Sequence, residues 1–407
     1  MRMNPQTLDR LSGGLILSAI VLALIAANSS LAGSYAAIHH APIRIGPAPF
    51  QIDEPLIVWI NQGLMTLFFV LVGVEIKREL LEGHLASLRR AALPAIAALG
   101  GMVVPALVYV AFTVGDGAQL RGWAIPMATD IALALAILSL LGHRVPVGLK
   151  VFLMALAIFD DLGAVVIIAV FYGEEIQAVP LILALGTFAV MMGLNRLGHA
   201  GPLALSVLGL LLWVALFQSG VEAALAGVLI AAAVPNGQKG VCAPSPLLRT
   251  ERLLHPWASL VIVPLFGFFN AGVTLELDTL RDIGGPVSMG VFLGLFLGKQ
   301  VGVIAATWAA VRMNIGLLPS GVGFLHIYGA GLLAGVGFTM GLFVTALAFE
   351  APAMAASARL AILAGSSLSA VTGLIVLWCA QRPRNRAPRR RSSEEFEKTS
   401  VQKPKTV

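Results

Sequence analysis

The chain has 407 residues, of which 58% are hydrophobic and only 12% charged, and its formal net charge is +6. Soluble globular domains carry about 25% charged residues, so this composition excludes a soluble protein and indicates a polytopic membrane protein. Long runs of Leu, Ala, Val, Ile and Gly favour packed helices over a barrel of alternating strands, and the two cysteines imply no disulfide framework and no thiolate metal site.

About twelve apolar segments follow one another along the chain, which predicts an all-α integral membrane fold of about twelve transmembrane helices. The first segment has one alternative, a signal peptide, because Arg2 and Arg10 precede it and "LAGSYA" offers small residues for cleavage. The run is nevertheless long enough to span a membrane. The expected segments are 11–29, 56–76, 91–113, 123–142, 149–172, 178–195, 202–218, 221–235, 256–275, 287–311, 324–349 and 357–380.

Basic residues gather on one side of these segments. With the N-terminus in the cytoplasm, the alternate connections and the C-terminal tail hold 22 of the 27 Lys and Arg residues, and the opposite side holds four. Cytoplasmic loops of membrane proteins carry this excess of positive charge. We therefore expect residues 1–10 and a disordered basic tail, 381–407, to be cytoplasmic. The tail could contact anionic lipid, and the net charge gives no reason to expect a nucleic-acid partner.

Asp160 and Asp161 lie at the centre of the apolar stretch from 151 to 171. A helix of that length spans about 30 Å, so both carboxylates are expected near the middle of the bilayer. One acidic side chain there costs about 2.5 kcal/mol or more. Asp130 and Lys299 also lie inside apolar segments. A purely structural ion-pair network is one interpretation, but three acids against one base leave surplus negative charge that a cation or a proton would neutralise.

Four further ionisable residues have two interpretations each. Glu75, Arg78 and Glu79 lie at the cytoplasmic end of the second segment, where they form either a helix-end salt-bridge cluster or a regulatory site. Glu222 lies near the outer end of a short segment, and the simpler interpretation is that its carboxylate reaches water at the interface.

The fourth and eleventh segments are expected to be broken helices. Pro126 precedes Asp130 in the fourth segment, and "LLAGVGFTMGLF" places four glycines around Thr339 in the eleventh. The exposed ends of half-helices call for a carboxylate and an ammonium, for which Asp130 and Lys299 are the candidates. Segments 91–172 and 287–380 each have the broken helix in the middle and start on opposite sides, which predicts an inverted-topology repeat.

Five motifs together resemble the NhaA-type sodium/proton antiporters, over residues 11–380. They are "LVGVEIKREL", "ATDIALAL", "LMALAIFDDLGA", "HPWASLVIVPLFGFFNAGV" and "GVGFTMGLF". The resemblance implies a single transporter domain of twelve helices, in which segments 4 and 11 are broken and cross at mid-membrane. It also implies an electrogenic, pH-regulated exchanger in the cell inner membrane, with sodium, lithium and protons as transported ions, no cofactor, and a homodimer joined through an outer hairpin loop at about 40–54.

The resemblance assigns roles to individual residues. Asp161 would be the principal sodium ligand, Asp160 its neighbour, paired with Lys299 when sodium is absent, and Thr129 a further oxygen ligand. Asp130 would balance the dipoles of the broken helices. The implied pH-regulation cluster consists of Glu75, Arg78, Glu79 and Glu251, with Glu222 standing at the position of a histidine in the family motif "SGVHA".

Three positions depart from the family pattern. Besides Glu222, Gln62 stands where an acid is usual and Gln300 where proline is usual. A glutamate changes charge well below neutral pH, unlike histidine, so the pH profile is the property that Glu222 affects.

Sodium is a hard cation that prefers oxygen ligands, so paired carboxylates that bind either sodium or protons give exchange. Two enzyme classes are disfavoured. Intramembrane aspartyl proteases place their two aspartates on separate helices, whereas the two aspartates of this chain are adjacent. Membrane prenyltransferases place their acidic motifs at the cytoplasmic boundary of the membrane, whereas here the acids are central. A transporter or channel for another ion or solute is the nearer alternative.

Overall fold

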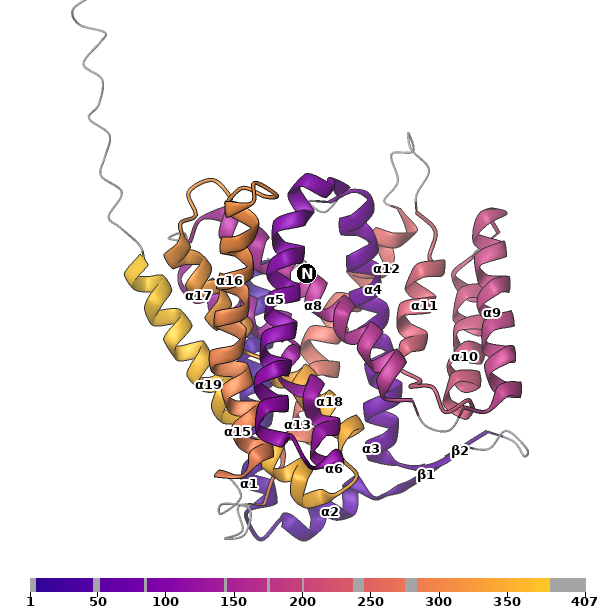
Figure 1. Cartoon of the computed structure of the whole chain (residues 1–407). Helices are drawn as coiled ribbons and strands as arrows, with labels where there is room; N and C mark the ends of the chain where they lie inside the picture. The colour runs from indigo at the N-terminus through magenta and orange to yellow at the C-terminus, as the bar shows by residue number, and fades with distance from the viewer. Residues whose placement is uncertain are drawn as a thin grey trace, which may run out of the picture.

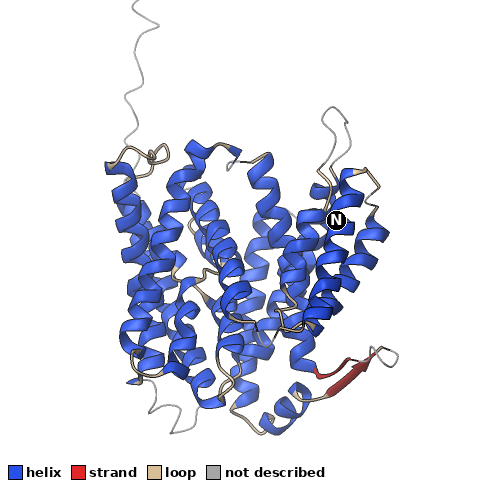
Figure 2. Ribbon diagram, turned by 45° about the vertical axis from the view of Figure 1, so that its right-hand side comes forward, coloured by secondary structure: helices blue, strands red, loops and turns tan. Residues whose placement is uncertain are grey.

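The computed structural model describes residues 5–46, 52–83, 86–142, 145–173, 176–199, 201–236, 245–274 and 284–380, and most of these are helical. Figure 2 shows the helices stacked side by side, with one small sheet projecting from an end of the bundle. The first half contains α1 (Pro5–Ala27), α2 (Ala32–His39), β1 (Pro42–Ile45), β2 (Ile52–Pro55), α3 (Leu56–Val58), α4 (Met65–Leu81), α5 (Leu88–Thr113), α6 (Gly117–Leu120), α7 (Ile131–Leu140), α8 (Val147–Phe171) and α9 (Ala178–Arg196).

The second half contains α10 (Pro202–Gln218), α11 (Leu225–Ala233), α12 (Pro246–Trp257), α13 (Val263–Ala271), α15 (Pro286–Leu293), α16 (Lys299–Arg312), α17 (Phe324–Ala334), α18 (Phe338–Ala348) and α19 (Pro352–Ala380). A 3₁₀-helix, η3 (Arg121–Met127), precedes α7, and three π-helical turns interrupt long helices: η1 (Trp59–Leu64), η5 (Ala258–Ile262) and η7 (Gly294–Gly298). π-Helical turns inside α-helices are rare and frequently lie at functional sites.

Seven described helices are long and apolar enough to cross a membrane, and ten spans result if each bent helix pair is counted as one. α10 is shorter, and α11 has only nine residues. Large apolar side chains on the outer helices are exposed, such as Val179 at 81% and Leu203 at 77%, which suits contact with lipid. The fold is therefore that of an all-α, multi-pass membrane protein, whereas the count of twelve spans remains a prediction.

Two helix ends differ from the expected segments. α1 begins at Pro5, inside the segment expected to precede the first span, because proline is well tolerated in a first helical turn. The segment expected from residue 221 becomes helical only at Leu225, after a turn.

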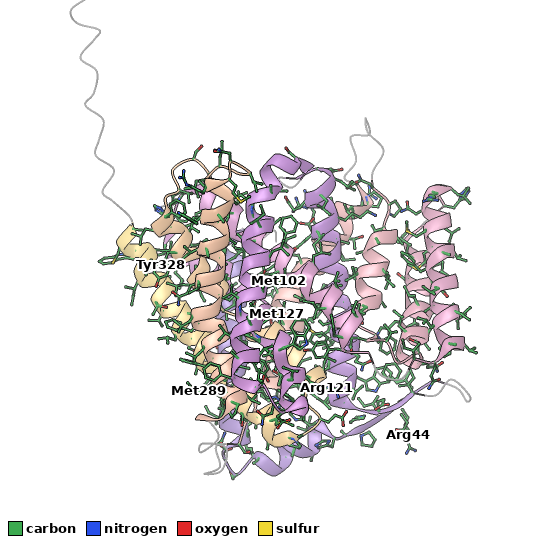
Figure 3. All side chains as sticks on the ribbon, viewed as in Figure 1. Arg44, Met102, Arg121, Met127, Met289 and Tyr328 are labelled. Carbon is green, nitrogen blue, oxygen red and sulfur yellow. The ribbon has the colours of Figure 1, made fainter. Side chains whose placement is uncertain are left out.

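The loop after α2 contains a β-hairpin. β1 and β2 pair antiparallel with Pro42 opposite Pro55, and Arg44 and Asp53 form an exposed ion pair at 2.8 Å. Figure 1 shows this hairpin at one end of the bundle and the C-terminal end of α19 at the opposite end. Figure 3 places Arg44 and Arg121 toward the hairpin end, and Met102 at mid-height within the bundle.

Glycines bring several helix pairs into backbone contact. A Cβ atom at Gly302 of α16 would overlap the carbonyl of Gly100 on α5, and one at Gly298 would lie 2.8 Å from Cα of Pro105. α4 and α11 approach in the same way, since a Cβ at Gly73 would lie 2.7 Å from Cβ of Ala231. Small residues at such crossings allow the close packing that holds helices together in lipid.

We expect Gly302→Ala to destabilise the protein because the added methyl group has to push α16 away from α5. Overpacking of this kind costs about 1–3 kcal/mol. The matched control is Gly186→Ala on α9, where a Cβ meets nothing within 4 Å. There the better helix propensity of alanine should leave stability unchanged or raise it. Thermal unfolding of the two purified variants in detergent checks this, and equal midpoints would contradict the packing argument.

Candidate functional site

Two broken helices meet inside the bundle. The first bends by 43° between η3 and α7, and the second by 44° between α17 and α18. Residues at the two breaks are hydrogen-bonded to each other: Asp130 N–H donates to Val336 O at 2.7 Å, and the Thr129 hydroxyl donates to Ala334 O at 2.8 Å. Backbone groups freed by each break are thus satisfied by the other break, which is what an apolar surrounding requires.

The local sequence explains both breaks. Pro126 has no N–H to donate, and it ends the 3₁₀-helix shortly before Asp130. In the second break, a Cβ on Gly337 would lie 2.7 Å from Ala128 O, so only glycine allows the two breaks to approach this closely. The prediction of interrupted helices at these positions is confirmed by the bends, although their crossing at mid-membrane is not tested by the bends alone.

Asp130 connects the N-terminal ends of two half-helices. Its Oδ1 accepts from the N–H of Leu133 at 2.9 Å, which caps α7, and its Oδ2 accepts from Thr339 N–H at 3.1 Å and Thr339 Oγ1 at 2.7 Å in the first turn of α18. A carboxylate is favoured at a helix N-terminus by the macrodipole and by the free N–H groups. The side chain is only 2% exposed. Asp130 therefore lies between the N-terminal ends of α7 and α18 and is hydrogen-bonded to both.

Asp160, Lys299 and Thr129 form a buried polar group. Lys299 Nζ lies 2.5 Å from Asp160 Oδ2, and Thr129 Oγ1 lies 2.6 Å from the same oxygen. Asp160, Thr129 and Lys299 are each 0% exposed. The charge-assisted hydrogen bond from an ammonium to a carboxylate is strong in such a site. The structure thus brings together the residues that the sequence analysis had placed in one ion-binding site.

Two buried carboxylate oxygens, one in this group and one on the adjacent residue, have no hydrogen-bond partner among the residues described. They are Oδ1 of Asp160 and Oδ1 of Asp161. Asp161 is 1% exposed, and it interacts electrostatically with Asp160, Asp130, Glu75 and Lys299. An unsatisfied buried carboxylate oxygen is costly, and a hard cation or a proton removes that cost.

Lys299 follows directly after the π-helical turn η7 and begins α16. Its stem runs past Gly101 of α5, where a Cβ would lie 3.7 Å from Lys299 Cδ and 3.8 Å from Nζ. The sequence showed the lysine but neither the π-helical turn nor the glycine beside it. Thr339, which donates twice to Asp130, was likewise missed as a site residue. Its position between the glycines of the second break was the only available signal.

The expected helix-end cluster joins α4 to α12. Arg78 pairs with Glu79 at 3.1 Å and with Glu251 at 2.7 Å, and Glu79 is buried. Glu75 lies one turn earlier on α4, half-buried and within electrostatic reach of Asp161. The sequence places these residues on two distant segments, and the structure brings them to one end of the bundle.

Glu222 is buried. The simpler interpretation of the sequence, in which its carboxylate reaches water at the interface, is therefore wrong. Its side chain is 7% exposed, in the turn that leads into α11. The turn is drawn inward because α11 packs closely on α4: a Cβ on Gly227 would overlap the carbonyl of Thr66, and Thr66 Oγ1 lies 3.4 Å from Ala223 O. The carboxylate of Glu222 is therefore held inside the protein.

The other two departures from the family pattern lie in or next to π-helical turns. The side-chain amide of Gln300 donates to Phe296 O of η7 at 2.5 Å, and the backbone carbonyl of Gln62 in η1 accepts from Trp213 Nε1 at 3.3 Å. Among the described hydrogen bonds, neither residue contacts Asp160 or Asp161.

Comparison with known proteins places the chain in a family. The family model described as Na+/H+ antiporter 1 matches residues 6–377. The chain is similar to the Na(+)/H(+) antiporter NhaA of Rhodospirillum rubrum, at 49% identity over 383 residues that cover 92% of this chain and 96% of the relative. It is also similar to the Na(+)/H(+) antiporter NhaA 2 of Pseudomonas syringae pv. syringae, at 51% identity over 368 residues, or 90% and 92% of the two chains.

A third relative, the Na(+)/H(+) antiporter NhaA of Shewanella loihica, is 49% identical over 363 residues, which cover 89% of this chain and 92% of the relative. These matches confirm the resemblance drawn from the five motifs. The chain belongs to the Na+/H+ antiporter 1 family, which is a family of transporters and not of enzymes.

Proposed function

We propose that the protein exchanges cytoplasmic sodium, and also lithium, for external protons. The observation that carries this proposal is that Oδ1 of Asp160 and Oδ1 of Asp161 are buried without a hydrogen-bond partner among the described residues, while Lys299 pairs with the other oxygen of Asp160. Family membership supports the same activity.

The exchange follows from competition for one site. With both carboxylates deprotonated, their free oxygens and the hydroxyl of Thr129 replace part of the hydration shell of sodium. When protons occupy the carboxylates, the attraction for sodium is lost. Exchange results if the site opens to one side of the membrane at a time, since each occupant then leaves only when the other arrives.

In this proposal, Lys299 is the reason that each transport cycle moves net charge across the membrane. Sodium bound at Asp160 displaces the ammonium from its partner, and Lys299 then releases its proton while Asp161 releases another. More than one proton therefore crosses for each sodium ion. Such exchange moves net charge, so its rate depends on the membrane potential at about 2.3 kcal/mol per charge per 100 mV.

The remaining sequence predictions complete the proposal. The protein has twelve spans in the cell inner membrane, with both termini cytoplasmic and an inverted repeat over 91–172 and 287–380. The opposite locations of the hairpin and the end of α19 support this orientation. The hairpin presents strand edges on which a second protomer can pair, and that supports a homodimer through the outer loop. The cluster around Arg78 and Glu251 regulates exchange in response to pH.

Sodium added to everted membrane vesicles should collapse a preformed proton gradient. Asp161→Asn should abolish this response, because an amide neither releases a proton nor offers a negative charge to sodium. We expect the exchange rate to fall at least 100-fold, which corresponds to about 2.7 kcal/mol or more. A pH-gradient dye measures the response in cells that lack other exchangers. Asp53→Asn, in the exposed hairpin, is the control that should keep full activity.

Absence of sodium-dependent proton flux in the unaltered protein at every pH from about 6.5 to 9 would reject the proposed function. Retention of normal sodium affinity in Asp161→Asn would instead show that the ligand has been misassigned.

Lys299→Ala should make exchange less sensitive to voltage because one of the exchanged protons is lost. It should also lower thermal stability, since an uncompensated buried charge costs about 3–5 kcal/mol. Exchange rates in proteoliposomes under imposed potassium diffusion potentials measure the first effect. Lys150→Ala, at the start of α8, should behave as the unaltered protein. An unchanged voltage response in Lys299→Ala would remove the lysine from the transport cycle.

Glu222→His should move the pH profile of exchange by about half a pH unit or more, because histidine changes charge between about pH 5 and 8 and glutamate does not. Glu222→Gln separates the loss of negative charge from the gain of a titrating group. The comparison is made in proteoliposomes at saturating sodium. A profile that stays in place in both variants would mean that the buried carboxylate has only a structural role.

A further inference from the structure

α19 presents two buried serines to the second helix break. It packs against both α17 and α18, and Ser366 and Ser369 lie one turn apart on the face that meets the break. The N–H of Gly337 donates to Ser366 Oγ at 3.2 Å. Ser369 Oγ lies beside Gly335, at 2.7 Å from the point where a Cβ on that glycine would be.

The two hydroxyls differ in their hydrogen bonding. Ser366 is 3% exposed and accepts from the backbone, whereas Ser369 is 0% exposed and its Oγ has no hydrogen-bond partner among the residues described. Both are buried on α19 and face the second helix break. Replacing each serine in turn therefore separates the effect of the hydrogen bond to Gly337 from the effect of side-chain packing.

Ser366 is linked to the carboxylate site through the first turn of α18. Gly337 is the N-cap residue of α18, and Thr339, two residues later, donates twice to Asp130. Asp130 in turn holds Val336 through its own N–H. Residues 336–339 are thus fixed from one side by Asp130 and from the other by Ser366.

We propose that Ser366 is a positioning residue for the sodium site. Rigid placement of Gly337 keeps both Thr339 donors on Asp130, and Asp130 keeps the neighbouring Thr129 hydroxyl on Asp160. Without the serine oxygen, the buried N–H of Gly337 loses its acceptor, and the start of α18 shifts to find another. Thr129 and Asp130 then move with it. The inference rests on the proposed sodium/proton exchange, because it concerns the ligands of that site.

The test compares four forms of the full-length protein in proteoliposomes: unaltered, Ser366→Ala, Ser366→Thr and Ser369→Ala. The half-saturating sodium concentration and the maximal rate are measured at one alkaline pH. We expect Ser366→Ala to raise the half-saturating concentration about 10-fold, the loss typical of an unpaired buried donor, while the maximal rate falls by about twofold or less. Ser366→Thr retains the oxygen and should restore affinity. Ser369→Ala removes no hydrogen bond and should match the unaltered protein.

Two results would overturn the inference: unchanged sodium affinity in Ser366→Ala, or equal losses in Ser366→Ala and Ser369→Ala, which would indicate packing. If Ser366→Ala does not fold, amide hydrogen exchange over residues 335–341 in Ser366→Thr and Ser369→Ala replaces it. Protection equal to that of the unaltered protein in the threonine variant supports the inference, and loss of protection in the Ser369 variant alone rejects it. Failure of the proposed function is recognised separately, because the unaltered protein would then show no sodium-dependent proton flux.

Discussion

The surplus of buried negative charge around one ammonium is the constraint on which the rest of the structure depends. Lys299 neutralises Asp160, but among the residues described no basic side chain forms an ion pair with Asp161. Coulomb interactions are strong where water is excluded, so an uncompensated carboxylate there is costly. In the proposed exchange, a small cation or protons neutralise this surplus charge.

The helix breaks follow from the same constraint. Non-helical backbone inside a membrane is tolerated only where other parts of the protein satisfy its polar groups. Here Asp130 satisfies the ends of α7 and α18, and the two breaks satisfy each other through Val336 and Ala334. The same contacts place Thr129 next to Asp160. Unwinding therefore lets the Thr129 hydroxyl reach Asp160, at the site of the proposed exchange.

How far the sequence predicts the site depends on the kind of interaction. Asp130, Asp160, Asp161 and Lys299 could be identified because charged residues inside apolar segments are rare, and the breaks could be identified from proline and clustered glycines. Their position at mid-membrane suggested one network, but the specific pairing of Asp160 with Lys299 came from family resemblance, since spacing along the chain does not determine tertiary contacts.

Other features could not be predicted from the sequence. The role of Ser366 depends on a hydrogen bond between residues 29 apart, and serines are common on helices that pack in lipid. The burial of Glu222 depends on how closely α11 approaches α4, which a segment boundary does not show. The π-helical turns lie in apolar stretches that look like uninterrupted helix. In each case, a contact between distant elements overrides the local pattern.

α5 contributes no atom to the ion pair of Lys299 and Asp160, yet both helices that carry this pair pack against it. Asp160 is on α8 and Lys299 on α16, and both helices pack against α5. Gly100 and Gly101 allow α16 and the lysine stem to lie directly on the α5 backbone, and Gly163 of α8 leaves space for Met102 of α5. An added methyl group at Gly100 would overlap the backbone carbonyl of Gly302 and so push α16, with its lysine, away from α5. The glycines of α5 thus help to set the position of the ion pair, because an interaction at 2.5 Å in a close-packed interior depends on the helices that carry it.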